Sequence, residues 1–321
     1  MQKSIKLSAL TVVGLSLLAT ASASQAAVNG TDDRQETYLD VRMHKIARAT
    51  LLQVPTVYAN QNDKKQWTVD FVELSDSSYY NVCKDEKFAS QKLSPIACTG
   101  FLIAPDLMMT AGHCMVNFGK AEKIQTAHCE SFAWLLDYQA SAQGQPATEG
   151  LPEDKIVRCK EVIYANFAYS NKDGINTYSQ DIALVRLERP ITDRPHLKLA
   201  MSEPAIAEKL AMVGYPHGVP AKYVKNSAVL NTDHPDYIRT NIDAVGGNSG
   251  SPVLNAKDEV VGLLVRSFPN ADLVDDKKQG CARWNRCSSD MMSCMENDKD
   301  YLHGTEVQRA SAILPFLPAG I

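Results

Sequence analysis

Short apolar segments separated by turn residues recur along most of the chain. Residues 67–74 (WTVDFVEL) alternate apolar and polar positions, and a period of two is the pattern of a half-buried strand. Residues 252–267 predict a hairpin with its turn at 255–258. Helical periodicity is clear only at 306–317. Further strands are predicted within 101–103, 155–164, 182–187, 209–215, 237–244 and 260–265. Many short strands with turn signals predict an all-β protein, either a sandwich or barrels.

Two stretches differ from this pattern. Residues 117–152 are polar and rich in Gln, Ala and Gly, and residues 267–304 are charged and carry three cysteines. We expect both to be insertions that form surface loops. With these insertions included, residues 27–321 are predicted to form one domain.

The first 26 residues have the pattern of an export signal. Lys3 and Lys6 precede an apolar stretch at 7–19, and small residues follow up to Ala26. A membrane anchor is the alternative, but the apolar stretch is short for a hydrocarbon layer of about 30 Å. The sequence therefore predicts that residues 1–26 are removed and that the protein is secreted or periplasmic, with no membrane contact afterwards.

Composition supports a globular exported protein. Apolar residues make up 45 % of the 321 residues and the formal net charge is −4. This combination excludes a disordered chain, and without a strongly basic balance nucleic acid is not an expected partner. The chain has eight cysteines, an even number that predicts disulfides in an oxidising compartment.

The segment 246–252 (GGNSGSP) carries the strongest chemical signal. A serine between glycines predicts a tight turn that exposes the hydroxyl of Ser249. Such a turn can direct the main-chain N–H groups of Gly247 and Ser249 at one point, as stabilisation of an oxyanion requires. The alternative is an ordinary glycine turn with no catalytic role.

Two further segments supply a base and an acid. His113, in the TAGHC segment 110–114, is the predicted general base for Ser249. Asp181 begins the apolar run DIALVRL and is predicted to fix the tautomer of His113 and to stabilise its charged form. The alternatives are a structural histidine and a common strand-start aspartate.

Together these segments resemble the trypsin-like, chymotrypsin-fold serine endopeptidases. The chain order His113, Asp181, Ser249 matches that family and neither the subtilisin nor the α/β-hydrolase order. Asn248, where digestive relatives carry aspartate, is typical of the bacterial glutamyl-endopeptidase branch. The resemblance covers residues 27–265. It implies two packed antiparallel β-barrels, to which the periodicity adds a short C-terminal helix at 306–317.

The resemblance also implies a disulfide between Cys98 and Cys114, next to the catalytic histidine. Spacing suggests a second bridge, Cys129 with Cys159, across the first insertion. The remaining four cysteines can pair in three alternative ways, and the sequence does not choose among them. These four are Cys83, Cys281, Cys287 and Cys294. A zinc site on the last three is the alternative, but the segment lacks a C-x-x-C pair, so no metal is predicted.

Substrate preference depends on residues around the Ser249 turn. Asp243 lies six residues before Ser249, where trypsin-type relatives bind Lys or Arg with a carboxylate. The glutamyl branch has a histidine at the position of Leu264. We therefore predict a preference for a basic residue, with Asp243 and Arg266 as candidate substrate-binding residues. The alternative is that Asp243 pairs with Arg266 or Arg239.

The function predicted from the sequence is a secreted serine endopeptidase that needs no cofactor. It would act on protein or peptide substrates through an acyl-enzyme. A catalytically silent homologue that acts as a binding or toxin-like module is the competing hypothesis. Labelling with a fluorophosphonate separates them, because only an activated serine reacts.

Overall fold

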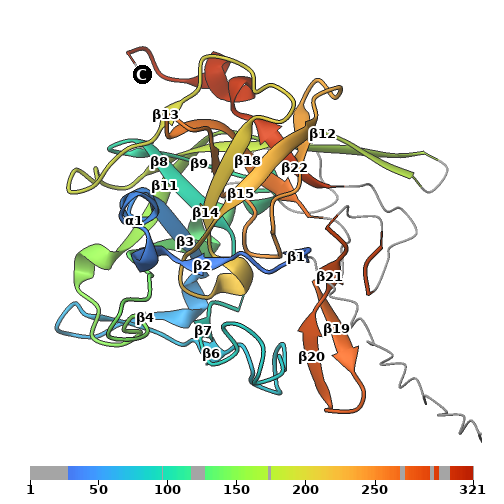
Figure 1. Ribbon diagram of the computed structural model, residues 1–321. Coiled ribbons are helices and arrows are strands. Elements are labelled where there is room, and N and C mark those ends of the chain that lie inside the picture. Colours follow the sequence, from blue (N-terminus) through green and yellow to red (C-terminus); the bar gives the residue numbers. More distant parts are fainter. Residues whose placement is uncertain are drawn as a thin grey trace, which may run out of the picture.

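The computed structural model consists mainly of two closed antiparallel β-barrels, and each barrel has six strands (Figure 1). The structure describes residues 28–95, 97–116, 127–172, 175–267, 272–289, 293–295 and 304–320. The first barrel has the strand order β10-β11-β12-β9-β8-β3. Its strands are β3 (Thr50–Pro55), β8 (Thr99–Ala104), β9 (Leu107–Thr110), β10 (Phe132–Leu136), β11 (Ile156–Lys172) and β12 (Ile175–Leu187).

The second barrel follows in the chain and closes through its last strand. β18 pairs with β17 on one side and with β22 on the other, which completes the ring β18-β17-β14-β15-β16-β22. Its strands are β14 (Lys209–Gly214), β15 (Lys222–Asn231), β16 (Tyr237–Thr240), β17 (Pro252–Leu254), β18 (Glu259–Arg266) and β22 (Thr305–Arg309). The short strands β2 (Gln35–Glu36) and β13 (Lys198–Leu199) add to β15 and β18.

Smaller elements surround the barrels. The helix α1 (Val41–Ala47) is capped by Asp40, whose side chain accepts hydrogen bonds from main-chain N–H groups of the first turn. The helix buries Met43 and Ile46 against the barrels. The remaining strands are β1 (Val28–Asn29), β4 (Ala59–Gln61), β5 (Trp67–Val69), β6 (Val72–Glu73), β7 (Lys92–Leu93), β19 (Leu273–Asp276), β20 (Cys281–Trp284) and β21 (Arg286–Cys287). The helices are α2 (Ala127–Ser131) and 3₁₀ turns at Thr37–Leu39, Thr56–Tyr58, Gly112–Cys114, Glu153–Lys155, Pro216–Gly218 and Ala310–Phe316.

Most strands lie where the hydrophobic pattern predicts them. The hairpin 252–267 is confirmed as β17 and β18. Its turn is held by the Asn255 side chain, which accepts hydrogen bonds from the main-chain N–H groups of Lys257 and Glu259. The segment 67–74 forms two short strands, β5 and β6, and only the first half of 237–244 is a strand.

The predicted C-terminal helix is shorter than its periodicity indicates. Thr305–Arg309 is the strand β22, and only Ala310–Phe316 coils, as a 3₁₀ helix. β22 pairs with both β16 and β18, so closure of the barrel requires it to be extended. Both faces of β22 are buried, and a strand of that kind lacks the alternation that would separate it from a helix.

The expectation that 117–152 is a surface loop is wrong for part of this stretch. Its apolar run Phe132–Leu136 is β10, which lies between β11 and β3, and Trp134 is fully buried in the first barrel. The second stretch, 267–304, contains the β19–β20 hairpin, which lies outside the barrels in Figure 1. Its Trp284 is buried in a small apolar cluster with Leu74 and Val245.

All eight cysteines are paired. The bridge Cys98–Cys114 joins β8 to the segment after β9, and Cys129–Cys159 joins α2 to β11. The four cysteines whose pairing the sequence leaves open form the bridges Cys83–Cys281 and Cys287–Cys294. The first ties the second stretch to the segment of Cys83, and the second closes a short loop within that stretch. Four disulfides fit an oxidising compartment. The predicted export signal lies outside the described residues, and no helix among those described is long and apolar enough to cross a membrane.

Candidate active site

His113 and Asp181 lie in contact on neighbouring parts of the first barrel. The segment after β9 carries His113, and β12, which pairs with β9, carries Asp181. The main-chain N–H of His113 donates to Asp181 Oδ1 at 2.9 Å, and His113 Nδ1 lies 2.9 Å from Oδ2. Gly112 permits this approach, because a Cβ there would lie 1.8 Å from the carbonyl oxygen of Asn166. One carboxylate oxygen therefore holds the main chain of His113 and the other holds Nδ1 of its imidazole, which together fix the orientation of the ring.

Asp181 is a buried carboxylate with several partners. Its side chain is 1 % exposed, and its main-chain N–H donates to Gln308 Oε1 at 2.8 Å. Burial disfavours the charged carboxylate, but the charge and hydrogen bonds of His113, with the charge of Arg266, outweigh it and lower the pKa of Asp181. Asp181 is thus anionic at neutral pH and placed to stabilise a positive charge on His113.

The turn that carries Ser249 packs against β8 and against the segment that carries His113. The main-chain N–H of Thr99 donates to the carbonyl oxygen of Ser249 at 2.7 Å, and Cys114 Sγ lies 3.9 Å from the same oxygen. Gly250 has a φ of +87°, and a Cβ there would lie 2.9 Å from the nitrogen of Ala111. The structure therefore brings the turn of Ser249 beside the segment of His113, in contact with Ala111 and Cys114.

The two main-chain N–H groups predicted to bind an oxyanion lie in the same turn. Thr99 Oγ1 donates to the carbonyl oxygen of Gly247 at 2.9 Å, which ties the turn to β8. Gly247 has a φ of +87° and would place a Cβ 2.3 Å from the carbonyl oxygen of Tyr215. Within the described residues, neither the N–H of Gly247 nor that of Ser249 has a hydrogen-bond acceptor. Two amides without an acceptor, two residues apart, can receive a developing negative charge.

Asp243 lies against the N-terminal segment of the chain. Its side chain is buried, Oδ1 accepts from the N–H of Asn29 at 2.7 Å, and Oδ2 accepts from the N–H of Asp33 at 3.4 Å. Burial raises the pKa of Asp243 well above its ordinary value, and the nearby acids Asp33 and Asp32 add to this despite the bond from Asn29. Both carboxylate oxygens thus contact the main chain of the protein itself.

Arg266 stands between two buried carboxylates. Its Nη1 lies 3.4 Å from Asp181 Oδ2, and its Nε donates to Glu306 Oε2 at 2.6 Å. Arg239 contacts the other oxygen of Glu306 at 3.5 Å. The alternative that Asp243 pairs with one of these arginines is therefore wrong, because their carboxylate partners are Glu306 and Asp181.

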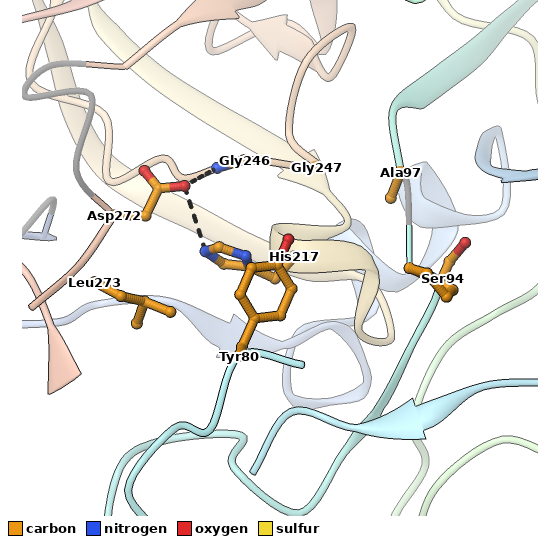
Figure 2. Close-up of a pocket in the computed structure, with 9 residues that line it drawn as sticks. Tyr80, Ser94, Ala97, His217, Gly246, Gly247, Asp272 and Leu273 are labelled. Carbon is orange, nitrogen blue, oxygen red and sulfur yellow. Dashed lines mark hydrogen bonds and ion pairs between the residues drawn. The ribbon is translucent and has the colours of Figure 1, made fainter. Parts of the chain in front are cut away.

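A pocket of about 480 Å³ adjoins the Ser249 turn at Gly246 and Gly247, and Figure 2 shows its walls. His217 Nε2 lies 3.3 Å from Asp272 Oδ2, and the same oxygen accepts from the N–H of Gly246 at 2.6 Å. The pocket is lined by Tyr80, Ser94, Pro95, Ala97, His217, Gly246, Gly247, Asp272 and Leu273. No motif in the sequence links His217 to Asp272, and the sequence prediction missed both.

One group of potential metal ligands occurs among the described residues. A ring nitrogen of His113 and the sulfurs of Cys98 and Cys114 lie within 4.8 Å of one another. The two sulfurs form a disulfide, and a disulfide has no thiolate to offer a metal ion. The bridge instead supports the loop that carries His113.

The sequence of this two-barrel protein matches a known family of peptidases. A sequence profile of the trypsin-like peptidase domain matches residues 98–263, just over half of the chain, and the match includes His113, Asp181 and Ser249. The chain belongs to the trypsin-like peptidase family. Its activity class is therefore proteolysis.

Solved structures with a similar chain trace include a Glu endopeptidase in complex with MPD. It shares 17 % identity with a TM-score of 0.41, over 77 % of this chain and 94 % of that one. The Rv3671c protease in an inactive form shares 13 % identity with a TM-score of 0.41, over 87 % and 92 %. A mutant of Rv3671c from M. tuberculosis H37Rv shares 12 % identity with the same TM-score, over 86 % and 88 %.

Proposed function

We propose that this protein is a secreted serine endopeptidase in which Ser249 is the nucleophile, His113 the general base and Asp181 the acid that orients it. The observation that carries the proposal is the double contact of Asp181 with His113, 2.9 Å at each oxygen, beside the turn of Ser249. Nδ1 of the imidazole is held by the carboxylate, so Nε2 is the nitrogen that can take a proton.

The proposed reaction is acyl transfer to water. Ser249 Oγ attacks the carbonyl carbon of the peptide bond while His113 Nε2 takes the hydroxyl proton. The N–H groups of Gly247 and Ser249 stabilise the oxyanion of the tetrahedral intermediate. His113 then gives the proton to the leaving amine, and the C–N bond breaks. His113 then takes a proton from water as the water attacks the acyl-enzyme, and it gives this proton to Ser249 Oγ as the C–O bond breaks and the acid product leaves.

Export is the second part of the proposal. Its support is the pattern of residues 1–26 together with four disulfides, which persist in oxidising compartments. Expression of the full chain in a bacterial host, followed by N-terminal sequencing of the exported protein, tests it. We expect the exported protein to begin at Ala27, and a protein that keeps residues 1–26 would contradict the proposal.

The proposed preference for a basic residue before the cut bond is separable from the catalytic assignment. Its support is the position of Asp243 six residues before Ser249, and the buried Leu264 offers no charge to an acidic side chain. Against it stands the use of both Asp243 oxygens by Asn29 and Asp33. Chromogenic peptides ending in Arg, Lys, Glu or Phe decide between these observations.

The Asp243→Asn variant makes that comparison sharper. If Asp243 binds the substrate, kcat/KM of the variant should fall about 100-fold on Arg and Lys substrates and stay unchanged on Phe substrates. If Asp243 only anchors the N-terminal segment, all four substrates change by the same factor. A wild-type preference for Glu would contradict the proposed specificity.

Casein hydrolysis by the Ser249→Ala variant tests the catalytic assignment. We expect turnover to fall by about 10⁴–10⁶, since other enzymes with this triad lose that much. Ser202→Ala, at an exposed serine, is the matched control and should match the wild type. Equal activity of wild type and Ser249→Ala would refute the assignment.

A further inference from the structure

The peptide group between Gly246 and Gly247 is held from outside its own turn. The carbonyl oxygen of Gly246 accepts a hydrogen bond from the main-chain N–H of His217 at 2.6 Å. A trans peptide is planar, so its N–H points to the side opposite its carbonyl. The bond from His217 therefore fixes the direction of the Gly247 N–H, one of the two groups proposed to bind the oxyanion.

This peptide needs such a restraint because it joins two glycines. Glycine backbones rotate freely, and Gly247 has a φ of +87°, a value that other residues rarely adopt. Rotation of this peptide by half a turn would place the Gly246 carbonyl oxygen where the N–H points now. A carbonyl dipole in that position would repel an oxyanion that the N–H stabilises.

Asp272 contacts both Gly246 and the side chain of His217, as Figure 2 shows. Its Oδ2 accepts from the N–H of Gly246 at 2.6 Å and lies 3.3 Å from Nε2 of His217. One carboxylate oxygen thus holds the N–H of Gly246 and lies beside the ring of His217, the residue whose main-chain N–H binds the Gly246 carbonyl. Both polar ends of Gly246 are fixed by this arrangement.

His217 is itself rigidly placed. It is 5 % exposed, and its ring packs edge-on against Tyr80, with ring centres 4.4 Å apart, and near Trp284 at 5.3 Å. Its φ of +49° lies in the left-handed region, which residues other than glycine adopt infrequently. In this conformation the main-chain N–H of His217 donates to the carbonyl oxygen of Gly246.

The hairpin segment explains how Asp272 reaches the turn. Asp272 directly precedes β19, the β19–β20 hairpin is fastened by Cys83–Cys281, and Trp284 of β20 packs near His217. We propose that Asp272, acting with His217, is a positioning residue that holds the Gly246–Gly247 peptide in the orientation that binds the oxyanion. The extra segment after β18 then serves catalysis without touching the substrate. This inference rests on the proposed function.

Kinetics of Asp272→Ala on the best peptide substrate test the inference. An oxyanion contact stabilises the transition state and not the bound substrate, so kcat should fall while KM stays unchanged. Loss of a direct oxyanion donor lowers kcat about 10²–10³-fold, and loss of a residue that only positions the donor should lower it less, about 10–100-fold. Asp272→Asn keeps an acceptor for Gly246 and should recover to within about fivefold of the wild type. Asp275→Ala, at an exposed acid of the same strand β19, is the matched control.

Binding of two peptide inhibitors separates positioning from a merely structural role. A peptidyl aldehyde forms a tetrahedral adduct with Ser249 and needs the oxyanion site, whereas the corresponding peptidyl alcohol does not. In Asp272→Ala the aldehyde Ki should rise by the factor by which kcat/KM falls, and the alcohol Kd should be unchanged. Equal losses for both inhibitors, or wild-type values throughout, would overturn the inference.

A second variant guards against misfolding of Asp272→Ala. Gly246→Ala leaves the hairpin sequence intact, and its Cβ would lie 3.0 Å from Asp272 Oδ2, so the carboxylate must shift. We expect a smaller loss of kcat, about 3–10-fold, with the same split between aldehyde and alcohol. A wild-type enzyme without turnover or aldehyde adduct would instead overturn the proposed function itself.

Discussion

The Ser249 turn is supported differently on its two sides. On the His113 side, the supporting groups lie on strands of the barrels, and the Cys98–Cys114 bridge closes a short stretch of chain. On the Gly246 side, support comes from His217, in the loop after β14, and from Asp272, beside a hairpin outside the barrels. The barrels thus hold the charged pair of His113 and Asp181, whereas a loop of the second barrel and the added segment together restrain one flexible peptide.

Asp181→Asn disrupts the contacts on the His113 side of the turn and should lower kcat more than any other substitution in this comparison. An amide in place of the carboxylate no longer favours the Nδ1–H tautomer, so kcat should fall by about 10⁴, as in other enzymes with this triad. The fold should persist, because Asn keeps an acceptor for the N–H of His113. Peptide hydrolysis near pH 7.5 measures the effect, and a loss below tenfold would contradict the role of Asp181.

Arg266→Met tests whether the charge beside Asp181 is structural. Among the described residues the variant leaves Glu306, 1 % exposed, with Arg239 as its one cationic partner, which should cost about 3 kcal/mol of unfolding free energy. Turnover should fall less than tenfold, because Asp181 keeps both contacts with His113. Urea unfolding and peptide kinetics measure the two quantities.

The double variant Arg266→Met/Glu306→Gln is the control for this prediction. It removes the uncompensated charge and should recover most of the lost unfolding free energy. A large rise in KM with unchanged stability would instead favour the substrate-binding role that the sequence suggests for Arg266.

Removal of the Cys83–Cys281 bridge tests the support on the Gly246 side of the turn. Cys83→Ser/Cys281→Ser frees the hairpin that positions Asp272, so kcat should fall about 10–100-fold, and Asp272→Ala should add nothing further. Cys129→Ser/Cys159→Ser is the matched control in the first barrel. That control should lose about 3–4 kcal/mol of stability in the chain-entropy model and keep its kcat. Equal kcat losses in both would contradict the division between the two sides.

Lys222 gives the smallest expected effect and tests the packing of its buried ammonium against Glu36 and Phe88. Its ammonium lies 3.1 Å from Glu36 and 4.7 Å from the centre of the Phe88 ring, and burial lowers its pKa to about 8. Between pH 8 and 10 the unfolded chain binds more protons at this lysine than the native one. The free energy of unfolding should therefore rise with pH, by about 2 kcal/mol over that range.

Lys222→Met provides the comparison for that measurement. Methionine has no titratable group, so the difference in unfolding free energy between wild type and variant should change by this amount from pH 8 to pH 10. A difference that does not vary with pH would mean that Lys222 has an ordinary pKa in the folded protein.

Local patterns explain how much of this structure the sequence predicts. The β17–β18 hairpin and its Asn255 turn follow from alternation and turn chemistry within 16 residues. β10 and β22 escape detection because strands buried on both faces lose their alternation. Their place in the sheets depends on barrel closure, which no local window contains.

The same reasoning applies to the site. His113, Asp181 and Ser249 lie in segments whose motifs are each complete within a few residues. Asp272 and His217 have no such motif, since their contact with Gly246 depends on the fold and on the Cys83–Cys281 bridge. The buried anchoring of Asp243 by Asn29 and Asp33 is likewise a tertiary contact that a position relative to Ser249 does not reveal.

Mass spectrometry of the purified protein after reaction with a fluorophosphonate is the most direct test of the catalytic assignment. The probe bonds only to a serine that an adjacent base activates and an oxyanion site assists. We predict a single adduct on the peptide that contains Ser249, much slower labelling of His113→Ala, and none of Ser249→Ala. A folded wild-type protein that takes up no probe, or takes it up at another serine, would contradict the account.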